Sequence, residues 1–114
     1  MKYLLLICED PTARPRDEAS AGAMMAEYGR FTEDIAASGE LVGGERLHGV
    51  DNATCVRVND GHLSVTDGPF AETKEHLGGY YLVDVPDLDR AIELAGRIPA
   101  ARSGVIEVRP VWEM

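Results

Sequence analysis

The segment 67–75 (DGPFAETKE) holds the densest group of side chains that could do chemistry. Its carboxylates could transfer protons, its lysine could pair with an anion, and its phenylalanine offers an aromatic contact. Apolar, strand-like runs lie on both sides, and charged loops between core strands often carry binding or catalytic residues. We therefore take Asp67 as a candidate catalytic carboxylate, and Phe70, Glu72 and Lys74 as candidate substrate contacts. The alternative is structural, because aspartate before glycine commonly forms turns and a charge run is commonly a solvated loop.

Three side chains outside this segment are further candidates. His76 follows it directly, and because imidazole titrates near neutrality, His76 is a candidate acid–base group. Tyr28 falls in an apolar stripe at helical spacing, where its hydroxyl either serves the core or faces a cleft. Arg109 shares a strand face with Glu107, and both are expected on a strand beside that of Asp84. These charges would either line a polar barrel interior, with Arg109 contacting substrate, or form a structural ion pair.

No cofactor and no metal are expected from the sequence. The three histidines share no metal-ligand spacing, and the two cysteines form neither a metal nor a redox motif. No glycine-rich phosphate loop stands between a strand and a helix. Cys8 and Cys55 are expected to be two buried, reduced thiols.

The elements that must position these candidates follow from the spacing of apolar residues. A strand is predicted at about 2–8, apolar on both pleat faces, so both faces must be covered. A helix is predicted over about 17–38. Its apolar stripe consists of Met24, Tyr28, Phe31 and Ile35. The next strand, at about 40–47, contains Gly43-Gly44, a pair that marks a bulge or a close backbone approach.

The second half of the chain adds a hairpin, a strand, a helix and a last strand. The turn NDG at 59–61 between two strand-like runs is a strong hairpin signal. Asp87 is the expected N-cap of the second helix. The apolar stripe of that helix is Leu88, Ala91, Ile92, Ala95 and Ile98. The strands of this half are expected at 54–58, 62–66, 79–85 and 105–111.

This order is β-α-β-hairpin-β-α-β, the split βαβ or ferredoxin-like plan of an α+β protein, with the hairpin as an addition. Two helices would cover one face of an antiparallel sheet, while the opposite face would leave apolar side chains in water. An apolar patch of that size usually marks an interface. We therefore expect a homodimer in which two sheets pack face to face.

Chain length and net charge limit the classes of function that are open to the protein. The 114 residues are expected to form one domain, 1–114. A net charge of −9 disfavours direct nucleic-acid binding, because an acidic surface repels phosphate backbones. The apolar run at 3–8 is too short for a signal peptide or a membrane span, which predicts a cytoplasmic protein without membrane contact.

Several strings along the chain resemble, in order, those of the DGPF branch of the YCII-related family. They are MKYLLLI at 1–7, LVGGE at 41–45, DGPFAETKE at 67–75, GGYYLV at 78–83 and VRPVWE at 108–113. The resemblance covers nearly the whole chain. It implies a dimeric α+β barrel with a small-molecule site at the dimer cleft.

The resemblance also implies an activity. Enzymatic function is suspected in the wider family because of a histidine on the first helix and an aspartate, a pair suited to general acid–base catalysis. Counted back from Gly39, which ends the first helix, the histidine's position is Tyr28 here, and Asp67 best matches the aspartate. The implied reaction is a proton transfer, isomerase- or lyase-like, on a small organic substrate. Tyrosine can donate a proton or hydrogen bond but needs activation to act as a base.

A second function comes from the same resemblance. The DGPF branch occurs joined to, or beside, sigma-factor-like proteins. This implies a non-catalytic regulatory or binding module associated with sigma-factor-dependent transcription initiation. The acidic surface would make such a module act through a sigma-factor protein rather than through DNA.

Overall fold

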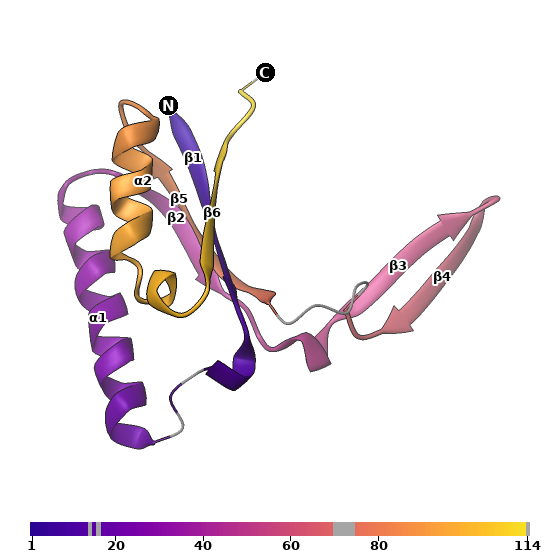
Figure 1. Cartoon of the computed structure of the whole chain (residues 1–114). Helices are drawn as coiled ribbons and strands as arrows, with labels where there is room; N and C mark the ends of the chain where they lie inside the picture. The colour runs from indigo at the N-terminus through magenta and orange to yellow at the C-terminus, as the bar shows by residue number, and fades with distance from the viewer. Residues whose placement is uncertain (14, 16, 70–74, 114) are drawn as a thin grey trace.

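The computed structural model describes residues 1–13, 15, 17–69 and 75–113. The described residues form a four-stranded sheet, two α-helices and a two-stranded arm. Figure 1 shows the helices beside the sheet and the arm reaching away from the body. The candidate substrate contacts Phe70, Glu72 and Lys74 lie outside the described residues.

The main sheet is antiparallel throughout, with the strand order β2-β5-β1-β6. Its strands are β1 (Lys2–Glu9), β2 (Leu41–Arg46), β5 (His76–Asp84) and β6 (Val105–Pro110). Helix α1 (Glu18–Ala37) follows β1, and helix α2 (Leu88–Arg97) follows β5. Short 3-10 helices occupy Pro11–Ala13, Val50–Asn52 and Pro99–Arg102. This is the predicted α+β, split βαβ arrangement, with the hairpin inserted between β2 and β5.

Local chemistry explains where the helices begin and end. The Asp17 carboxylate accepts a hydrogen bond from the Ser20 amide at 2.8 Å and caps α1. The same bond holds the pKa of Asp17 below its ordinary value. Asp87 caps α2 in the same way, accepting from the Arg90 amide at 2.9 Å. Gly39, with a φ of 80°, turns the chain away after α1.

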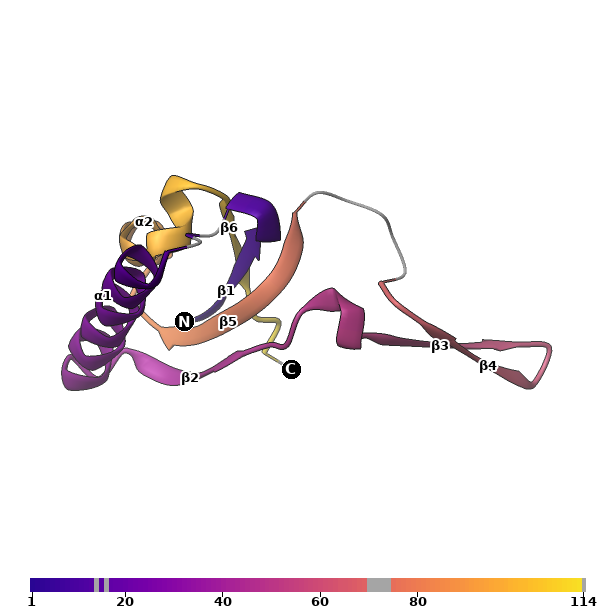
Figure 2. The same cartoon turned by 90° about the horizontal axis from the view of Figure 1, so that it is seen from below.

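The core lies between the two helices and one face of the sheet. Figure 2 shows from below that both helices lie on the same side of the sheet. Central strand β1 alternates in burial, so that every second side chain points toward the helices. The predicted stripe of α1 is confirmed at its C-terminal half, where Phe31 and Ile35 are buried. The largest fully buried side chains are Leu5, Ile35, Leu94, Ile98, Val83, Val85 and Pro99.

The predicted stripe of α2 was wrong in part. Leu88 and Ile92 are 47% and 53% exposed, whereas Leu94, absent from the predicted stripe, is fully buried. The buried face consists of Ala91, Leu94, Ala95 and Ile98. The spacing i, i+3, i+4, i+7 also defines one face of a helix, and the contact with the sheet selects this face over its neighbour.

The expectation that Asp84 neighbours Arg109 and Glu107 was also wrong. In the observed strand order β1 lies between β5 and β6, so β5 and β6 do not touch. Asp84 is paired in register with Lys2, and its carboxylate accepts from the N-terminal amine at 3.0 Å. Arg109 lies opposite Leu4 and is exposed.

The centre of the second face of the sheet is apolar and only half covered by the described residues. Leu4, Leu6, Tyr80 and Leu82 point to this side, opposite the helices, and are half-buried. Val105 at the edge is 51% exposed. A face of this kind is not expected to stay in water.

The two thiols are not fully buried, as had been expected; Cys8 and Cys55 are both half-buried and unbridged. Cys8 belongs to the second face of the sheet, which no further layer of the described residues covers. Partial burial raises the pKa of the Cys8 thiol, and the carboxylates of Glu107 and Glu75 raise it further. Cys55 donates to the Gly68 carbonyl at 2.8 Å.

The arm is the predicted hairpin, formed by β3 (Thr54–Asn59) and β4 (His62–Asp67). Asp60 and Gly61 both have positive φ, as a two-residue hairpin turn requires. One face of the arm is apolar, and its four side chains are between 58% and 69% exposed. They are Val56, Val58, Leu63 and Val65. The radius of gyration, 16.1 Å, exceeds the value of about 13 Å expected for a compact domain of this length, because the arm extends from the body.

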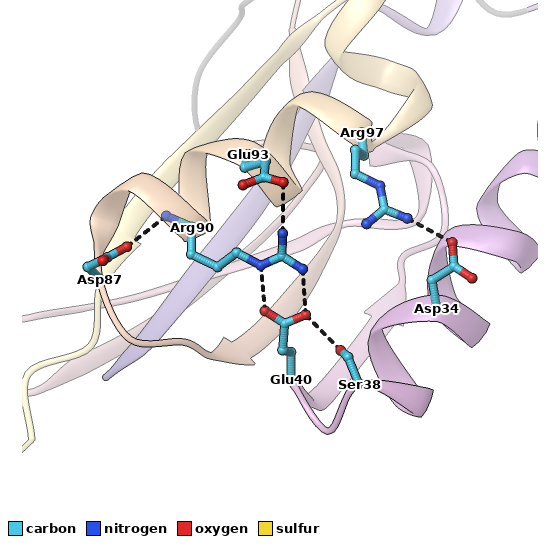
Figure 3. Close-up of polar contacts among 7 residues, drawn as sticks. All are labelled: Asp34, Ser38, Glu40, Asp87, Arg90, Glu93 and Arg97. Carbon is cyan, nitrogen blue, oxygen red and sulfur yellow. Dashed lines mark hydrogen bonds and ion pairs between the residues drawn. The ribbon is translucent and has the colours of Figure 1, made fainter.

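A group of ion pairs ties α2 to the end of α1 (Figure 3). The Arg90 guanidinium donates two hydrogen bonds to the Glu40 carboxylate, at 2.7 and 2.9 Å, and a third to Glu93 at 2.8 Å. The Ser38 hydroxyl donates to Glu40 at 2.7 Å. These bonds, those from Arg90 first, lower the pKa of Glu40 from 4.5 to about 2. The contact holds the α1–β2 turn against α2.

Glu40→Gln is expected to lower the free energy of unfolding at pH 7 by about 1–3 kcal/mol, since Arg90 loses a charged, two-point partner. The pKa of Glu40 is depressed on folding, so this stabilisation is complete above about pH 4.5 and is lost as the pH falls toward 2. Urea unfolding at pH 7 and pH 3 should therefore show a smaller difference between variant and wild type at pH 3. Glu93→Gln is the matched control, because the Glu93 side chain is 65% exposed and the pair should contribute little. An equal difference at both pH values would contradict the assignment.

Candidate functional site

A pocket of about 460 Å³ opens between the N-terminal half of α1 and the ends of β1, β2 and β5. Its walls are largely apolar, and methionines from α1 face the backbone of the two sheet strands. A cavity of this size with a few polar groups is typical of a small-molecule site. The lining residues are Ile7, Glu9, Pro15, Ala21, Met24, Met25, Tyr28, Thr32, Gly44, Glu45, Arg46, Gly78, Gly79, Tyr80 and Tyr81.

Glycines let β2 and β5 approach each other at the sheet side of the pocket. A Cβ on Gly44 would lie 2.8 Å from the Tyr80 carbonyl oxygen, and one on Gly79 would lie 2.8 Å from that of Glu45. Both contacts are closer than real Cβ atoms tolerate. The predicted meaning of the glycine pair in β2 is confirmed, since the register shifts between Leu41 and Gly43 and the backbones come close at Gly44.

A chain of hydroxyl groups crosses from the sheet to α1 inside the pocket. The Thr32 hydroxyl donates to the Tyr28 carbonyl oxygen at 2.8 Å, and its oxygen lies 2.8 Å from the Tyr81 hydroxyl. A threonine hydroxyl has one proton, so both bonds form together only if Tyr81 donates to Thr32. The Tyr81 oxygen therefore keeps acceptor capacity but no proton to give. Its ring is held edge-on against Phe31, with centroids 5.2 Å apart.

The rim of the pocket carries charged side chains. Arg46, the last residue of β2, donates from Nη1 to the Met25 sulfur at 3.7 Å, and a thioether is a weak acceptor. No ion pair joins Arg46 to a carboxylate within the described ranges. Glu9 and Glu45 also line the pocket, but Glu45 projects from the opposite pleat face of β2. Arg46 thus offers a guanidinium at the mouth of an apolar cavity.

The structure places the predicted site residues apart from one another. Tyr28 lines the pocket and is half-buried. Asp67 ends β4 in the arm, is exposed, and pairs in register with Thr54. His76 begins β5, and Arg109 lies on the second sheet face. Of these described candidates, Tyr28 belongs to the pocket of its own protomer, and a meeting of Tyr28 with Asp67 across a dimer stays a prediction.

Most of the lining residues were not among the predicted site residues, and they include Thr32, Arg46 and Tyr81, whose polar groups are described above. Thr32 is four positions after Tyr28, so the two share a helix face. Arg46 and Tyr81 are brought together by the β2–β5 register, in which Gly44 opposes Tyr81 and Arg46 opposes Gly79. The glycine pairs in both strands were the available signal for a close approach, but they did not identify these side chains.

Among the described residues, no three histidine, cysteine, aspartate or glutamate side chains gather as metal ligands would. The described helices include none long and apolar enough to span a bilayer.

Comparison with known proteins gives two matches. The sequence model of the YCII-related domain matches residues 1–114. The chain is 34% identical over 118 residues to "Uncharacterized protein R00369" of Rhizobium meliloti (strain 1021), an alignment that covers 97% of this chain and 92% of the relative.

Proposed function

Because the chain belongs to the YCII-related family, we propose that it is a homodimeric protein whose pocket binds a small organic molecule. The observation that carries the proposal is the pocket itself. Among the described residues, the pocket combines apolar walls, a chain of hydroxyls and one guanidinium in about 460 Å³. That combination suits a ligand with an apolar body and few polar groups.

We further propose that the bound molecule undergoes proton transfer, in an isomerase- or lyase-like reaction. Tyr28 is the group in the pocket that supports this, because its phenol can donate a proton or a hydrogen bond to a developing negative charge. A base is also required. Asp67 would supply it only from the arm of a second copy, since in its own protomer it does not line the pocket. The 67–75 string that begins with Asp67 is the reason to place the protein in the DGPF branch.

Tyr28→Phe is expected to weaken binding of a cognate small molecule by roughly two- to tenfold, the effect of one lost hydrogen bond, and to reduce turnover further. Screening a library of small organic molecules by amide chemical shifts would identify such a ligand through shifts in residues that line the pocket. Tyr3→Phe is the matched control, because it removes the same atom from a buried tyrosine outside the pocket. A screen that shifts no lining residue would contradict the proposed function.

The homodimer proposal rests on two uncovered apolar surfaces, the second sheet face and one face of the arm. A two-stranded hairpin is only marginally stable alone in water, so the arm is expected to pack on another surface. Pairing of two sheets would remove the exposed face from solvent without a new element.

A regulatory module is the second candidate, favoured by the same arm. Its apolar face could instead receive a sigma-factor protein, which would link the chain to transcription initiation without catalysis. Size-exclusion chromatography of the two proteins together discriminates the candidates. A stable complex that forms with no small molecule present would favour the regulatory module over the enzyme.

A further inference from the structure

The polar groups of the pocket differ in what they can offer a ligand. Arg46 can only donate, and it carries a positive charge. The Tyr81 hydroxyl donates its hydrogen bond to Thr32, and the Thr32 hydroxyl donates to the Tyr28 carbonyl oxygen. The Tyr81 oxygen can therefore only accept a further hydrogen bond. A ligand that uses both of these groups accepts hydrogen bonds at one end and donates one from another part.

The spacing of these two groups follows from the sheet. Arg46 opposes Gly79 and Gly44 opposes Tyr81, so Arg46 and Tyr81 lie on adjacent strands, on the same pleat face. They are two register positions apart, about 7 Å along the strands. The apolar side chains of Met24 and Met25 lie across from this face. The pocket, at about 460 Å³, has room for a ligand body of about one six-membered ring.

We propose that the pocket takes a small organic acid with an apolar body. Its carboxylate pairs with the Arg46 guanidinium at the mouth, and a hydroxyl or amino group at its other end donates to the Tyr81 oxygen. Arginine is suited to this role because its planar fork matches a carboxylate, and the thioether it now contacts competes weakly. Glu9 also lines the pocket, but it lies on β1, with β5 between it and β2, and within the described residues no ion pair joins it to Arg46. The proposal rests on the small-molecule function above and names its ligand class.

Three probe molecules separate the contribution of the ligand's carboxylate to affinity from that of its hydrogen-bond donor. 4-Hydroxybenzoate carries both polar ends, benzoate lacks the donor, and phenol lacks the carboxylate. Titrations of the intact protein, followed by amide chemical shifts, should give 4-hydroxybenzoate the highest affinity. Arg46→Gln should weaken both acids by about tenfold or more and leave phenol unchanged, whereas Arg46→Lys should restore part of the loss. Tyr81→Phe should remove the advantage of 4-hydroxybenzoate over benzoate and leave benzoate unchanged.

Arg57→Gln is the matched control, because Arg57 is an exposed arginine of the arm and does not line the pocket. An equal loss of acid binding in Arg57→Gln would show non-specific attraction to cations and overturn the proposal. Acids that bind no more tightly than phenol would overturn it as well. If phenol shifts the pocket amides while the acids do not, the ligand class is wrong but the small-molecule function stands. If none of the three probes shifts them, the ligand class is wrong, and the library screen described above decides whether the small-molecule function stands.

Discussion

Phe31→Ala is expected to lower the free energy of unfolding by about 3–5 kcal/mol, the range for truncating a buried phenylalanine. Phe31 is 3% exposed and packs edge-on against Tyr81. The Arg97 guanidinium lies 5.4 Å from the centre of the ring and pairs with Asp34 at 2.8 Å. The substitution would leave a cavity in the core and remove the wall that orients Tyr81. Urea unfolding followed by circular dichroism measures the loss.

Two further variants test whether the stability loss in Phe31→Ala comes from the buried ring. Phe31→Leu keeps most of the apolar volume and is expected to be destabilised much less, by about 1–2 kcal/mol. Ile92→Ala removes an apolar side chain that is 53% exposed on α2, and should change stability by less than about 0.5 kcal/mol. A loss below about 1 kcal/mol for Phe31→Ala would mean that the ring is not part of the core in solution.

Leu6→Asp is expected to abolish the proposed homodimer. Leu6 lies on the second face of the sheet, in register with Tyr80 on one side and Glu107 on the other. An aspartate there would place an unpaired charge in the proposed interface, beside an existing carboxylate, which is very costly. Sedimentation should give about twice the protomer mass of 12.4 kDa for the wild type at micromolar concentration, and the protomer mass for the variant.

The control for this experiment is Ile92→Asp, which adds the same charge on the opposite, helical side of the protomer. It should remain a dimer. Circular dichroism of both variants separates loss of the dimer from loss of the fold. A wild-type protein that sediments as a monomer would exclude the face-to-face arrangement, and a dimeric Leu6→Asp would place the interface elsewhere.

The proposed proton-transfer reaction depends on a second copy of the chain, for a geometric reason. Proton transfer needs heavy atoms within roughly 2.6–3.2 Å of the substrate, or one bridging water. Within one protomer Tyr28 lines the pocket while Asp67 ends a strand of the extended arm. The sheet face that carries Leu6 and the apolar face of the arm are the surfaces through which a partner would bring the two together.

The sequence by itself determined the local elements of this protein. A short run apolar on both pleat faces predicted β1, a stripe at helical spacing predicted α1, and NDG at 59–61 predicted the turn of the arm. Asp87 as a helix cap and the close approach at Gly44 were also predicted. These features depend on neighbours within a few positions of the chain, or on the backbone freedom of a single residue type. Nearby sequence therefore contains the information that specifies them.

Only the tertiary structure decided which distant residues meet. The strand order separates Asp84 from Arg109, and the β2–β5 register brings Arg46 beside Tyr81. The phase of α2 against the sheet buries Leu94, although the spacing equally allowed a face through Ile92. Such choices depend on contacts between elements far apart in sequence, where the burial of one face competes with that of another. The pocket forms from residues of α1, β1, β2 and β5, which no local pattern connects.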